Sequence, residues 1–365
     1  MPDVRNFHVY YTAVDQILRD LVCPFLESST EGVRRAFFER HYAGGPHVRV
    51  RFLGDQRAVD RAADEFRNKV DLFLGSYPSS PLENYSAERA REMMEAEGQL
   101  PAAGELEYRV NCAIEAPYRR REPGVDPTPL TRLLETFLHD CTPIVNRILH
   151  SPSPKIESAL RIFFAQADLA GQGYMCSGAV AFRAHWEGFA GLMQNRKLID
   201  RIRRNYVDQK QTIGRLLAET IAFRSGSAAE ADGIVSGWST LIRSHEEYVA
   251  AALNERDNLG FTPVNADRLE EDLNGLKGRL MEPSIFLDAL LGNGQLFTAF
   301  SRQPALLRVR ILTNFLYCLV ANLGLTLLER MSLCYFSYVA IEEHFQCDLT
   351  EGLKGIIRNY APRSR

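Results

Sequence analysis

The chain has 365 residues, of which 45% are hydrophobic and 24% charged, a composition typical of globular domains. Its formal net charge is −3, so no global basic excess points to nucleic acid, and any anion binding has to be local. The N-terminus, MPDVRNFHVYY, places charges where a signal peptide has an apolar core. We therefore expect a cytoplasmic protein that binds no nucleic acid.

The first 125 or so residues mix strand and helix patterns. Aromatic and β-branched residues predict a strand at 6–13, followed by a helix at 14–26. Gly44 and Gly45 separate two further strand patterns and indicate a hairpin. The remaining predictions here are strands at 34–42, 46–54 and 106–118 and helices at 56–75 and 86–98, the last with Ser86 as its N-cap.

After the Pro/Gly-rich stretch RREPGVDPTP the pattern changes to helical periodicity. We predict an α+β protein, with a small N-terminal mixed sheet and helices in 1–125 and a larger all-helical region in 126–365, the two together forming one catalytic unit. The predicted helices are 128–150, 154–174, 178–194, 196–224, 230–256, 264–280, 284–300, 304–323 and 326–346.

Two features bear on compartment and membrane association. The seven cysteines form neither a CxxC pair nor a spacing typical of metal ligands, so we expect reduced, mostly buried thiols, no metal and no cofactor. Residues 311–328 are uncharged over about the length of a membrane span. Polar residues on several faces of this segment favour a buried core helix, and we expect no membrane association.

Several side chains could take part in ligand binding or catalysis. Arg49 and Arg51 lie two apart on a predicted strand, so their guanidinium groups share one face and could bind a carboxylate or an amide oxygen, although a solvated sheet face is the alternative. His185 could act as a general acid or base, or could be an ordinary helix histidine. The run Arg119 to Arg121 is either an electropositive lip or a solvated loop. No nucleophile elbow, HExxH or Walker motif is present.

Three motifs in order, FHVYY at 7–11, ERHYAGGPHVRVRF at 39–52 and VAFRAHWEGF at 180–189, resemble the C-terminal domain of class I lanthipeptide dehydratases. The resemblance spans about 6–346. It implies a small α/β region that binds a leader peptide and a helical region around the reaction cleft. Family members either eliminate glutamate from glutamylated Ser/Thr peptides or, as thiopeptide pyridine synthases, join two dehydroalanines in a formal [4+2] aza-cycloaddition with release of the leader.

The sequence departs from the elimination domains in two places. PYRRREPGVDP lacks their R-Y-G-G motif, although Tyr118 and Glu122 fit. In YCLVANLGLT, Cys318 stands where those domains have histidine and Leu323 where they have arginine, whereas Asn322 fits. These departures favour the cyclases. The alternatives are a glutamate-elimination lyase and a non-catalytic subunit that binds the leader peptide.

The cyclase hypothesis assigns a role to each candidate residue. Its substrate is a ribosomal precursor peptide, and other enzymes of the pathway are possible partners. Amide tautomerisation needs a proton donor and acceptor at one amide, and positioning supplies much of the rest. The catalytic candidates are Arg49, Arg51, His185 and Tyr317, and the substrate-binding candidates are His47, Arg119, Arg121, Arg183 and Asn322.

Overall fold

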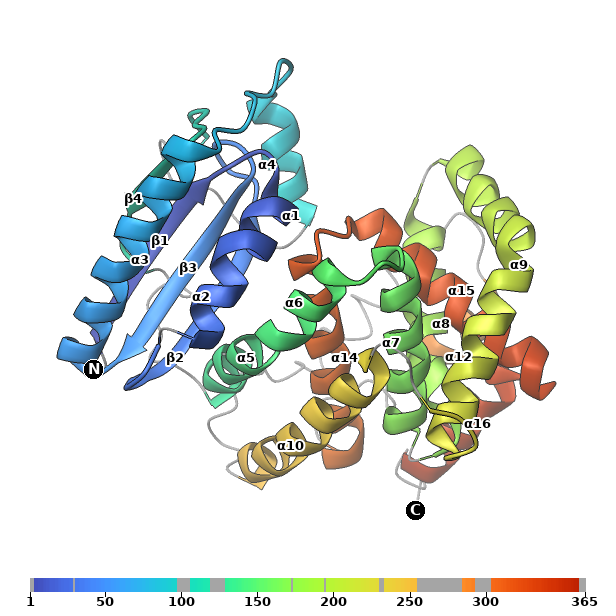
Figure 1. Cartoon of the computed structure of the whole chain (residues 1–365). Helices are drawn as coiled ribbons and strands as arrows, with labels where there is room; N and C mark the ends of the chain where they lie inside the picture. Colours follow the sequence, from blue (N-terminus) through green and yellow to red (C-terminus); the bar gives the residue numbers. More distant parts are fainter. Residues whose placement is uncertain are drawn as a thin grey trace. The chain divides into compact units, whose positions relative to one another are not determined.

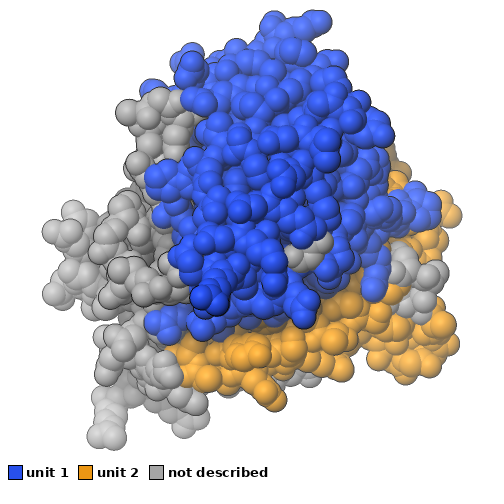
Figure 2. Space-filling view, turned by 60° about the vertical axis from the view of Figure 1, so that its left-hand side comes forward, with its two compact units in different colours: residues 1–152, 318–327 blue, residues 153–317, 328–365 orange. Residues whose placement is uncertain are grey.

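The chain folds into two compact units in a computed structural model (Figure 1). Unit 1 comprises Met1–Pro152 and Cys318–Leu327, and unit 2 comprises Ser153–Tyr317 and Leu328–Arg365 (Figure 2). Each unit is described by itself below. The structure describes residues 3–28, 30–96, 106–118, 129–171, 173–193, 195–229, 233–254, 284–292 and 303–360.

Unit 1 is built on a four-stranded antiparallel sheet in the order β2-β3-β1-β4. The predicted strands at 6–13, 34–42 and 46–54 are confirmed within about three residues of their ends. Their alternating side chains bury one sheet face against helices, which is the pattern that the sequence carries. The strands are β1 (Asp3–Tyr10), β2 (Val33–His41), β3 (His47–Gly54) and β4 (Cys112–Glu115).

The predicted hairpin joins β2 and β3. Gly44 and Gly45 have φ angles of +73° and +117°, which L-residues with side chains rarely adopt. A Cβ on Gly45 would also lie 2.9 Å from the carbonyl oxygen of Arg109. Both the backbone conformation and this close approach therefore require glycine at position 45.

The apolar face of the sheet packs on two helical segments (Figure 1). Phe7 and Phe52 are fully buried, and both rings contact Phe66 of α3 (Gln56–Ser76). Phe25 contacts the same cluster from a segment of three consecutive helical pieces. These are α1 (Val14–Ile17), the π-helix η1 (Leu18–Val22) and α2 (Cys23–Ser28), where one helix was predicted.

β4 is shorter than predicted, because the chain bends at Asn111. Asn111 has a φ of +51°, and its side-chain amide bonds the backbone and hydroxyl of Ser79 at 2.7–2.9 Å. Residues 106–111 do not pair as a strand. They lie against the turn between β2 and β3, where the Arg109 N–H donates to the Gly44 carbonyl at 2.7 Å. Of the predicted strand at 106–118, only Cys112–Glu115 pairs as a strand.

The remaining helices of unit 1 are α4 (Ala87–Ala96), α5 (Pro129–Asp140) and α6 (Thr142–His150). The Ser86 hydroxyl accepts from the Arg89 N–H at 3.2 Å, so the predicted N-cap is confirmed. The predicted helix at 128–150 is broken at Cys141, because a proline follows in the first turn of α6. The compact unit thus extends beyond residue 125, and the leader-binding role of 1–125 stays a prediction.

Unit 2 is helical throughout its described residues, as predicted. The α+β fold class is confirmed. The predicted helix at 264–280 lies outside the described residues, as do residues 293–300 of the one at 284–300. α16 was not predicted. The helices are α7 (Lys155–Ala170), α8 (Met175–Leu192), α9 (Arg196–Arg224), α10 (Ile234–Asn254), α12 (Ile285–Leu291), α14 (Pro304–Asn322), α15 (Leu327–Phe345) and α16 (Leu349–Tyr360).

α14, whose last residues, 318–322, belong to unit 1, contains residues 311–322 of the uncharged segment seen in the sequence. It is long and apolar enough to cross a membrane, the single such helix among the described residues, but half of the qualifying window is buried inside the protein. Ile311, Leu312, Phe315, Leu316 and Leu319 are at most 1% exposed. This burial is what the core helix of a soluble protein shows, so the helix is weak evidence for a membrane span.

The expectation that all cysteines are reduced thiols is wrong for one pair. Cys176 of α8 and Cys347, just beyond α15, form a disulfide within unit 2, although 171 positions separate them in sequence. No spacing pattern predicts such a pair, since only the tertiary fold brings its members together. The other five cysteines are free thiols. A cytoplasmic location stays a prediction.

Candidate functional site

α8 places His185 in unit 2, and its N-terminal half is held tightly against α7. A Cβ on Gly178 would lie 2.0 Å from the carbonyl oxygen of Ala167, so only glycine permits this helix contact. The packing fixes the rotation of α8, with the Phe182 ring tilted against that of Phe163 in α7 at 4.9 Å between ring centroids. His185, one turn further along, is directed to α14.

His185 is part of a three-residue hydrogen-bonded chain. Its Nδ1 atom bonds the hydroxyl of Tyr317 in α14, and this hydroxyl lies 3.3 Å from the Sγ atom of Cys334 in α15. A phenol has one proton to donate. The consistent order is therefore that Cys334 donates to Tyr317, and Tyr317 donates to an imidazole protonated on Nε2. The structure thus brings together His185 and Tyr317, which the sequence analysis had paired.

All three groups are neutral at pH 7. Burial, together with the nearby Arg310 guanidinium, lowers the pKa of His185 to about 4. The imidazole also keeps an exposed surface, so its desolvation is partial. Burial raises the pKa of Tyr317 well above 10 and that of Cys334 to about 12. A neutral imidazole beside a neutral phenol can accept one proton and return another.

The polar face of the sheet forms a second group of candidates, in unit 1. Opposite Arg49 on β3 lie His8 of β1 and Glu39 of β2. Residues directly opposite in an antiparallel sheet point to the same side. Arg49 and Arg51 therefore share one face, as predicted, together with Asn6, His8, Tyr10, Phe37, Glu39, His41 and His47.

The two arginines have different environments. Arg51 is 5% exposed and forms an ion pair with Glu39, while its guanidinium lies 5.5 Å from the ring centroid of Phe37 and 4.8 Å from that of Tyr118. Arg51 therefore does not lie on a solvated sheet face, the alternative considered from the sequence. Its ion pair with Glu39 links β3 to β2. Arg49 is half-buried, and its Nε–H donates to Nε2 of His47 at 3.2 Å. Arg49 is thus the better placed of the two to meet a ligand.

Three imidazoles surround the Arg49 position. The His47 ring lies 5.3 Å from that of His8 and 5.0 Å from that of His41, centroid to centroid. His47 donates from Nδ1 to the Gly45 carbonyl at 2.9 Å, which leaves Nε2 to accept from Arg49. Burial, with added repulsion from Arg49, lowers the pKa of His8 and of His41 to about 3 and that of His47 well below 6.5.

His8 and His41 were missed by the sequence analysis. Each falls on the same side of its strand as the arginine pair, which the alternation of FHVYY and of ERHY could have indicated. Alternation alone, however, does not tell which strands are neighbours. The pairing of β1 and β2 with β3 brings the three rings together, with His8 stacked on His47 and His41 tilted against it.

The other predicted residues have structural contacts. Arg183 donates to Glu187 and to Glu342, both at 2.7 Å, and joins α8 to α15. Asn322 is buried, and its Nδ2 donates to the Phe38 carbonyl at 3.1 Å, which ties the end of α14 to β2 within unit 1. Their substrate-binding roles stay predictions. Arg119 and Arg121 lie outside the described residues.

No group of three or more His, Cys, Asp or Glu side chains with metal-binding geometry occurs in the described part of the chain. The candidates thus consist of proton-handling groups in unit 2 and a guanidinium with neutral imidazoles in unit 1. Such groups can donate hydrogen bonds to an amide oxygen and relay protons.

Known proteins resemble this chain in family profile and in fold. The profile of the family described as "Lantibiotic biosynthesis dehydratase C-term" matches residues 5–341. The structure is similar to the pyridine synthase TbtD from thiomuracin biosynthesis, with a TM-score of 0.71 and 20% identity over 94% of this chain and 99% of that one. It is also similar to TsrL, with a TM-score of 0.67 and 16% identity over 100% of both chains. No curated protein matches the chain.

Proposed function

The chain belongs to the family of lantibiotic biosynthesis dehydratase C-terminal domains, and on this premise we propose that it is a peptide-modifying enzyme of natural-product biosynthesis that acts as a thiopeptide macrocyclase. Its substrate is a ribosomal precursor peptide, a leader followed by a core with two dehydroalanines. The product is a macrocycle closed by a six-membered nitrogen heterocycle. The similarity of fold to the pyridine synthase TbtD supports this choice within the family.

The chemistry makes few demands on the protein. The amide preceding one dehydroalanine tautomerises to its iminol, which turns that residue into a 2-azadiene. Addition to the alkene of the second dehydroalanine forms two C–C bonds, at the methylene carbon and at the iminol carbon of the azadiene, and closes the ring. Loss of the iminol oxygen as water and of the leader as its amide gives the pyridine. Proton transfer at one amide and confinement of the two reacting segments are the contributions required of the enzyme.

The hydrogen bond between His185 and Tyr317 is the observation that carries the proposal. Tautomerisation moves a proton from an amide nitrogen to its oxygen, so it needs an acceptor and a donor that are both neutral at the working pH. His185 is kept neutral by its lowered pKa, and Tyr317 by its raised pKa. The same pair can protonate the departing water, since each group regains its starting state after a full cycle.

Arg49 is assigned the binding of a peptide carbonyl. Its guanidinium carries a fixed charge, and hydrogen bonds aimed at an oxygen on which charge develops lower a barrier by about 3 kcal/mol. His47 orients Arg49 through Nε2. We assign the leader to β4, an outer strand of the sheet, where an extended peptide can add backbone hydrogen bonds. The outer edge of β2 is already used, because Ala36 bonds His139 and Phe38 accepts from Asn322.

The decisive experiment mixes the purified protein with a leader-bearing peptide that contains two dehydroalanines. Mass spectrometry should detect the macrocycle and the intact leader carrying a C-terminal amide. The release of the leader amide separates cyclisation from simple proteolysis, which would give a free carboxylate.

A second peptide, with glutamylated serine in place of dehydroalanine, tests the alternative. Loss of one glutamate mass from that peptide, with no leader amide from the first, would replace the cyclase by an elimination lyase. If both peptides bind and neither is turned over, the protein is a non-catalytic subunit that binds the leader peptide. Only leader amide release supports the proposal.

A further inference from the structure

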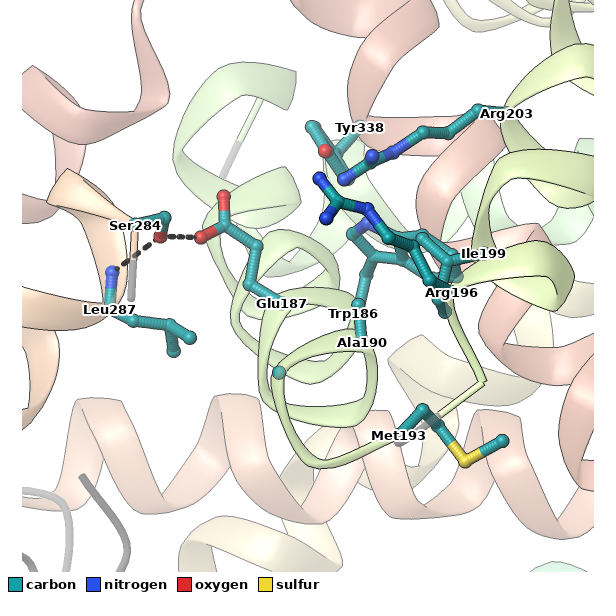
Figure 3. A pocket seen from close by; sticks show the side chains of 11 residues that line it. Trp186, Glu187, Ala190, Met193, Arg196, Ile199, Arg203, Ser284, Leu287 and Tyr338 are labelled. Atoms are coloured by element: carbon teal, nitrogen blue, oxygen red, sulfur yellow. Dashed lines mark hydrogen bonds between the residues drawn. The ribbon is translucent and has the colours of Figure 1, made fainter. Parts of the chain in front are cut away.

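Unit 2 contains a pocket that the proposed reaction does not use. It has a volume of about 330 Å³ and lies among α8, α9, α12 and α15 (Figure 3). This size is at the lower end of the ~300–1,000 Å³ typical of small-ligand sites. The lining residues are Trp186, Glu187, Ala190, Gly191, Met193, Arg196, Ile199, Arg203, Ser284, Leu287 and Tyr338.

The pocket lies on a different face of α8 from the proposed proton-handling pair. His185 faces α14 and Tyr317, whereas Glu187, Ala190 and Gly191 line the pocket. A helix turns by about 100° per residue, so these three positions cluster on a side that lies away from His185. Neither His185 nor Tyr317 is among the lining residues. A ligand here would bind apart from that pair.

The charges of the pocket favour an anion. Arg196 and Arg203 stand seven positions apart on α9, which puts them on one helix face, and Figure 3 shows both guanidinium groups directed from α9 toward α8. The one carboxylate in the lining is that of Glu187. It already accepts from Arg183 at 2.7 Å and from the hydroxyl of Ser284.

The glutamate is held in place by these contacts. Ser284 also caps α12 by accepting from the Leu287 N–H at 3.0 Å, so the Glu187 side chain is fixed between two helices. The Arg183 guanidinium offsets part of its charge, since Arg183 also donates to Glu342 at 2.7 Å.

The lining thus carries two cations and one carboxylate. Arg203 also lies 3.7 Å from Asp200, and because a guanidinium has five N–H donors it can bind a second carboxylate.

Most of the uncharged lining residues are apolar, apart from Ser284 and Tyr338. Ile199, Leu287 and Met193 contribute aliphatic surface, and the ring of Trp186 forms a wall that Tyr335 supports at 4.7 Å between ring centroids. A ligand that fits both parts carries a negative charge at one end and an aliphatic body at the other. The volume admits about one amino-acid residue, not an extended peptide.

We propose that this pocket binds a carboxylate attached to a small aliphatic body, the chemistry shared by a free N-acylated amino acid and by the C-terminal residue of a peptide. Arg196 and Arg203 bind the carboxylate, and Ile199, Leu287 and Met193 contact the aliphatic part. The proposal is independent of the cyclisation chemistry, because binding is measured without turnover.

The test uses the full-length protein and N-acetyl-L-leucine, with N-acetyl-L-leucinamide as the uncharged probe. Isothermal titration should show saturable binding of the acid at least tenfold tighter than of the amide. In protein labelled with ¹³C at the methionine methyl groups, the Met193 signal should shift on addition of the acid. Equal affinity for acid and amide, no saturable binding of the acid, or an unmoved Met193 signal would overturn the proposal.

Variants locate the contact. The double variant R196Q/R203Q should weaken binding of the acid at least tenfold, whereas R204Q, an exposed arginine of α9 that does not line the pocket, should leave it unchanged. Circular dichroism checks that each variant is folded. Unchanged affinity in the double variant contradicts the proposal.

A peptide Ala-Ala-Leu with a free C-terminus separates the two sources of the carboxylate. Tighter binding of this peptide than of the free acid identifies a chain end as the ligand. Binding of the free acid alone identifies a small molecule. Both results support a carboxylate site.

Discussion

The hydroxyl of Tyr317 contacts both His185 and Cys334, so one oxygen links an imidazole to a thiol in unit 2. Burial keeps Tyr317 and Cys334 protonated, and His185 stays neutral at pH 7. At the scale of single residues, the proposed chemistry therefore depends on neutral donors and acceptors and not on a nucleophile.

Replacing Tyr317 by phenylalanine tests this dependence. The ring packing is kept but the donor to His185 is lost, so turnover of the bis-dehydroalanine peptide should fall by about 10²–10⁴-fold, the usual contribution of general acid–base catalysis. Leader affinity should not change. Tyr248→Phe, an exposed tyrosine of the same unit, is the control. Undiminished turnover in Tyr317→Phe would remove this residue from the mechanism.

Substitutions of Arg49 and of Arg51 should affect different properties, mainly turnover for Arg49 and mainly stability for Arg51. Arg51→Gln leaves Glu39 without its buried partner, so the free energy of unfolding should fall by about 3 kcal/mol or more. Arg49→Gln removes a half-buried guanidinium, and turnover should drop roughly 100-fold with a smaller loss of stability. Urea unfolding and peptide turnover of both variants give the comparison. The reverse pattern would exchange the roles assigned to the two residues.

The sheet is the element that brings the imidazoles of unit 1 together. β1, β2 and β3 each contribute one histidine to its polar face, and all three rings are buried. Burial of an imidazole disfavours its charged form. The sheet therefore tolerates this cluster only while its histidines remain neutral.

Stability should accordingly fall in acid. Burial lowers the pKa of His8 and His41 to about 3, against 6.5 in the unfolded chain. Between these values the unfolded state binds more protons, so the stability present above pH 6.5 is lost as the pH falls toward 3. Each histidine contributes about 1.4 kcal/mol per pH unit in that window.

The variant His41→Gln checks the sign and the source of this effect. Urea unfolding between about pH 5 and pH 7 gives the slope of the unfolding free energy against pH. In His41→Gln this slope should be shallower than in the unchanged protein by the contribution of one histidine. His150→Gln, an exposed histidine of the same unit, should leave the slope as it is. A steeper slope, or none in the unchanged protein, would contradict the neutral cluster.

At the scale of the whole molecule, one covalent link closes a long segment of the chain. Cys176–Cys347 joins the start of α8 to the turn between α15 and α16, both in unit 2. Closing a loop of this length restricts the unfolded chain, for which about 2–4 kcal/mol is typical. The disulfide therefore stabilises unit 2 and makes its stability depend on redox conditions.

Thiol counting tests the link directly. Alkylation of the protein unfolded without reductant should label five of its seven cysteines, and all seven after reduction. The Cys347→Ser variant should unfold with a free energy lower by about 2–4 kcal/mol. Seven labelled thiols without reductant would show that the purified protein lacks the bond.

Elements with a clear period were predictable from the sequence. The helix at 196–224 was predicted with the observed ends, because α9 keeps its apolar stripe throughout and begins at the capping residue Asn195. The short β4 was overpredicted, since the bend at Asn111 depends on a bond to Ser79, 32 positions earlier. The break of the predicted helix 128–150 at Cys141 was overlooked despite the proline that follows it.

The candidate site was predictable only in part. The common face of Arg49 and Arg51 follows from alternation along one strand, a local property. The different environments of the two arginines come from Glu39 and Tyr118, and the latter lies 67 positions from Arg51. The pair of His185 and Tyr317 was suggested by resemblance, while their hydrogen bond required the packing of α8 with α14.

By itself, the sequence determined the fold class, the family resemblance and which side chains share a strand face, because these depend on periods and motifs within short segments. Only the tertiary structure decided the contacts of His8 and His41 with His47, the disulfide, and the pocket beside α9. The physical reason is that burial and contact between distant segments set the pKa of an imidazole, the pairing of a thiol and the charge balance of a cavity.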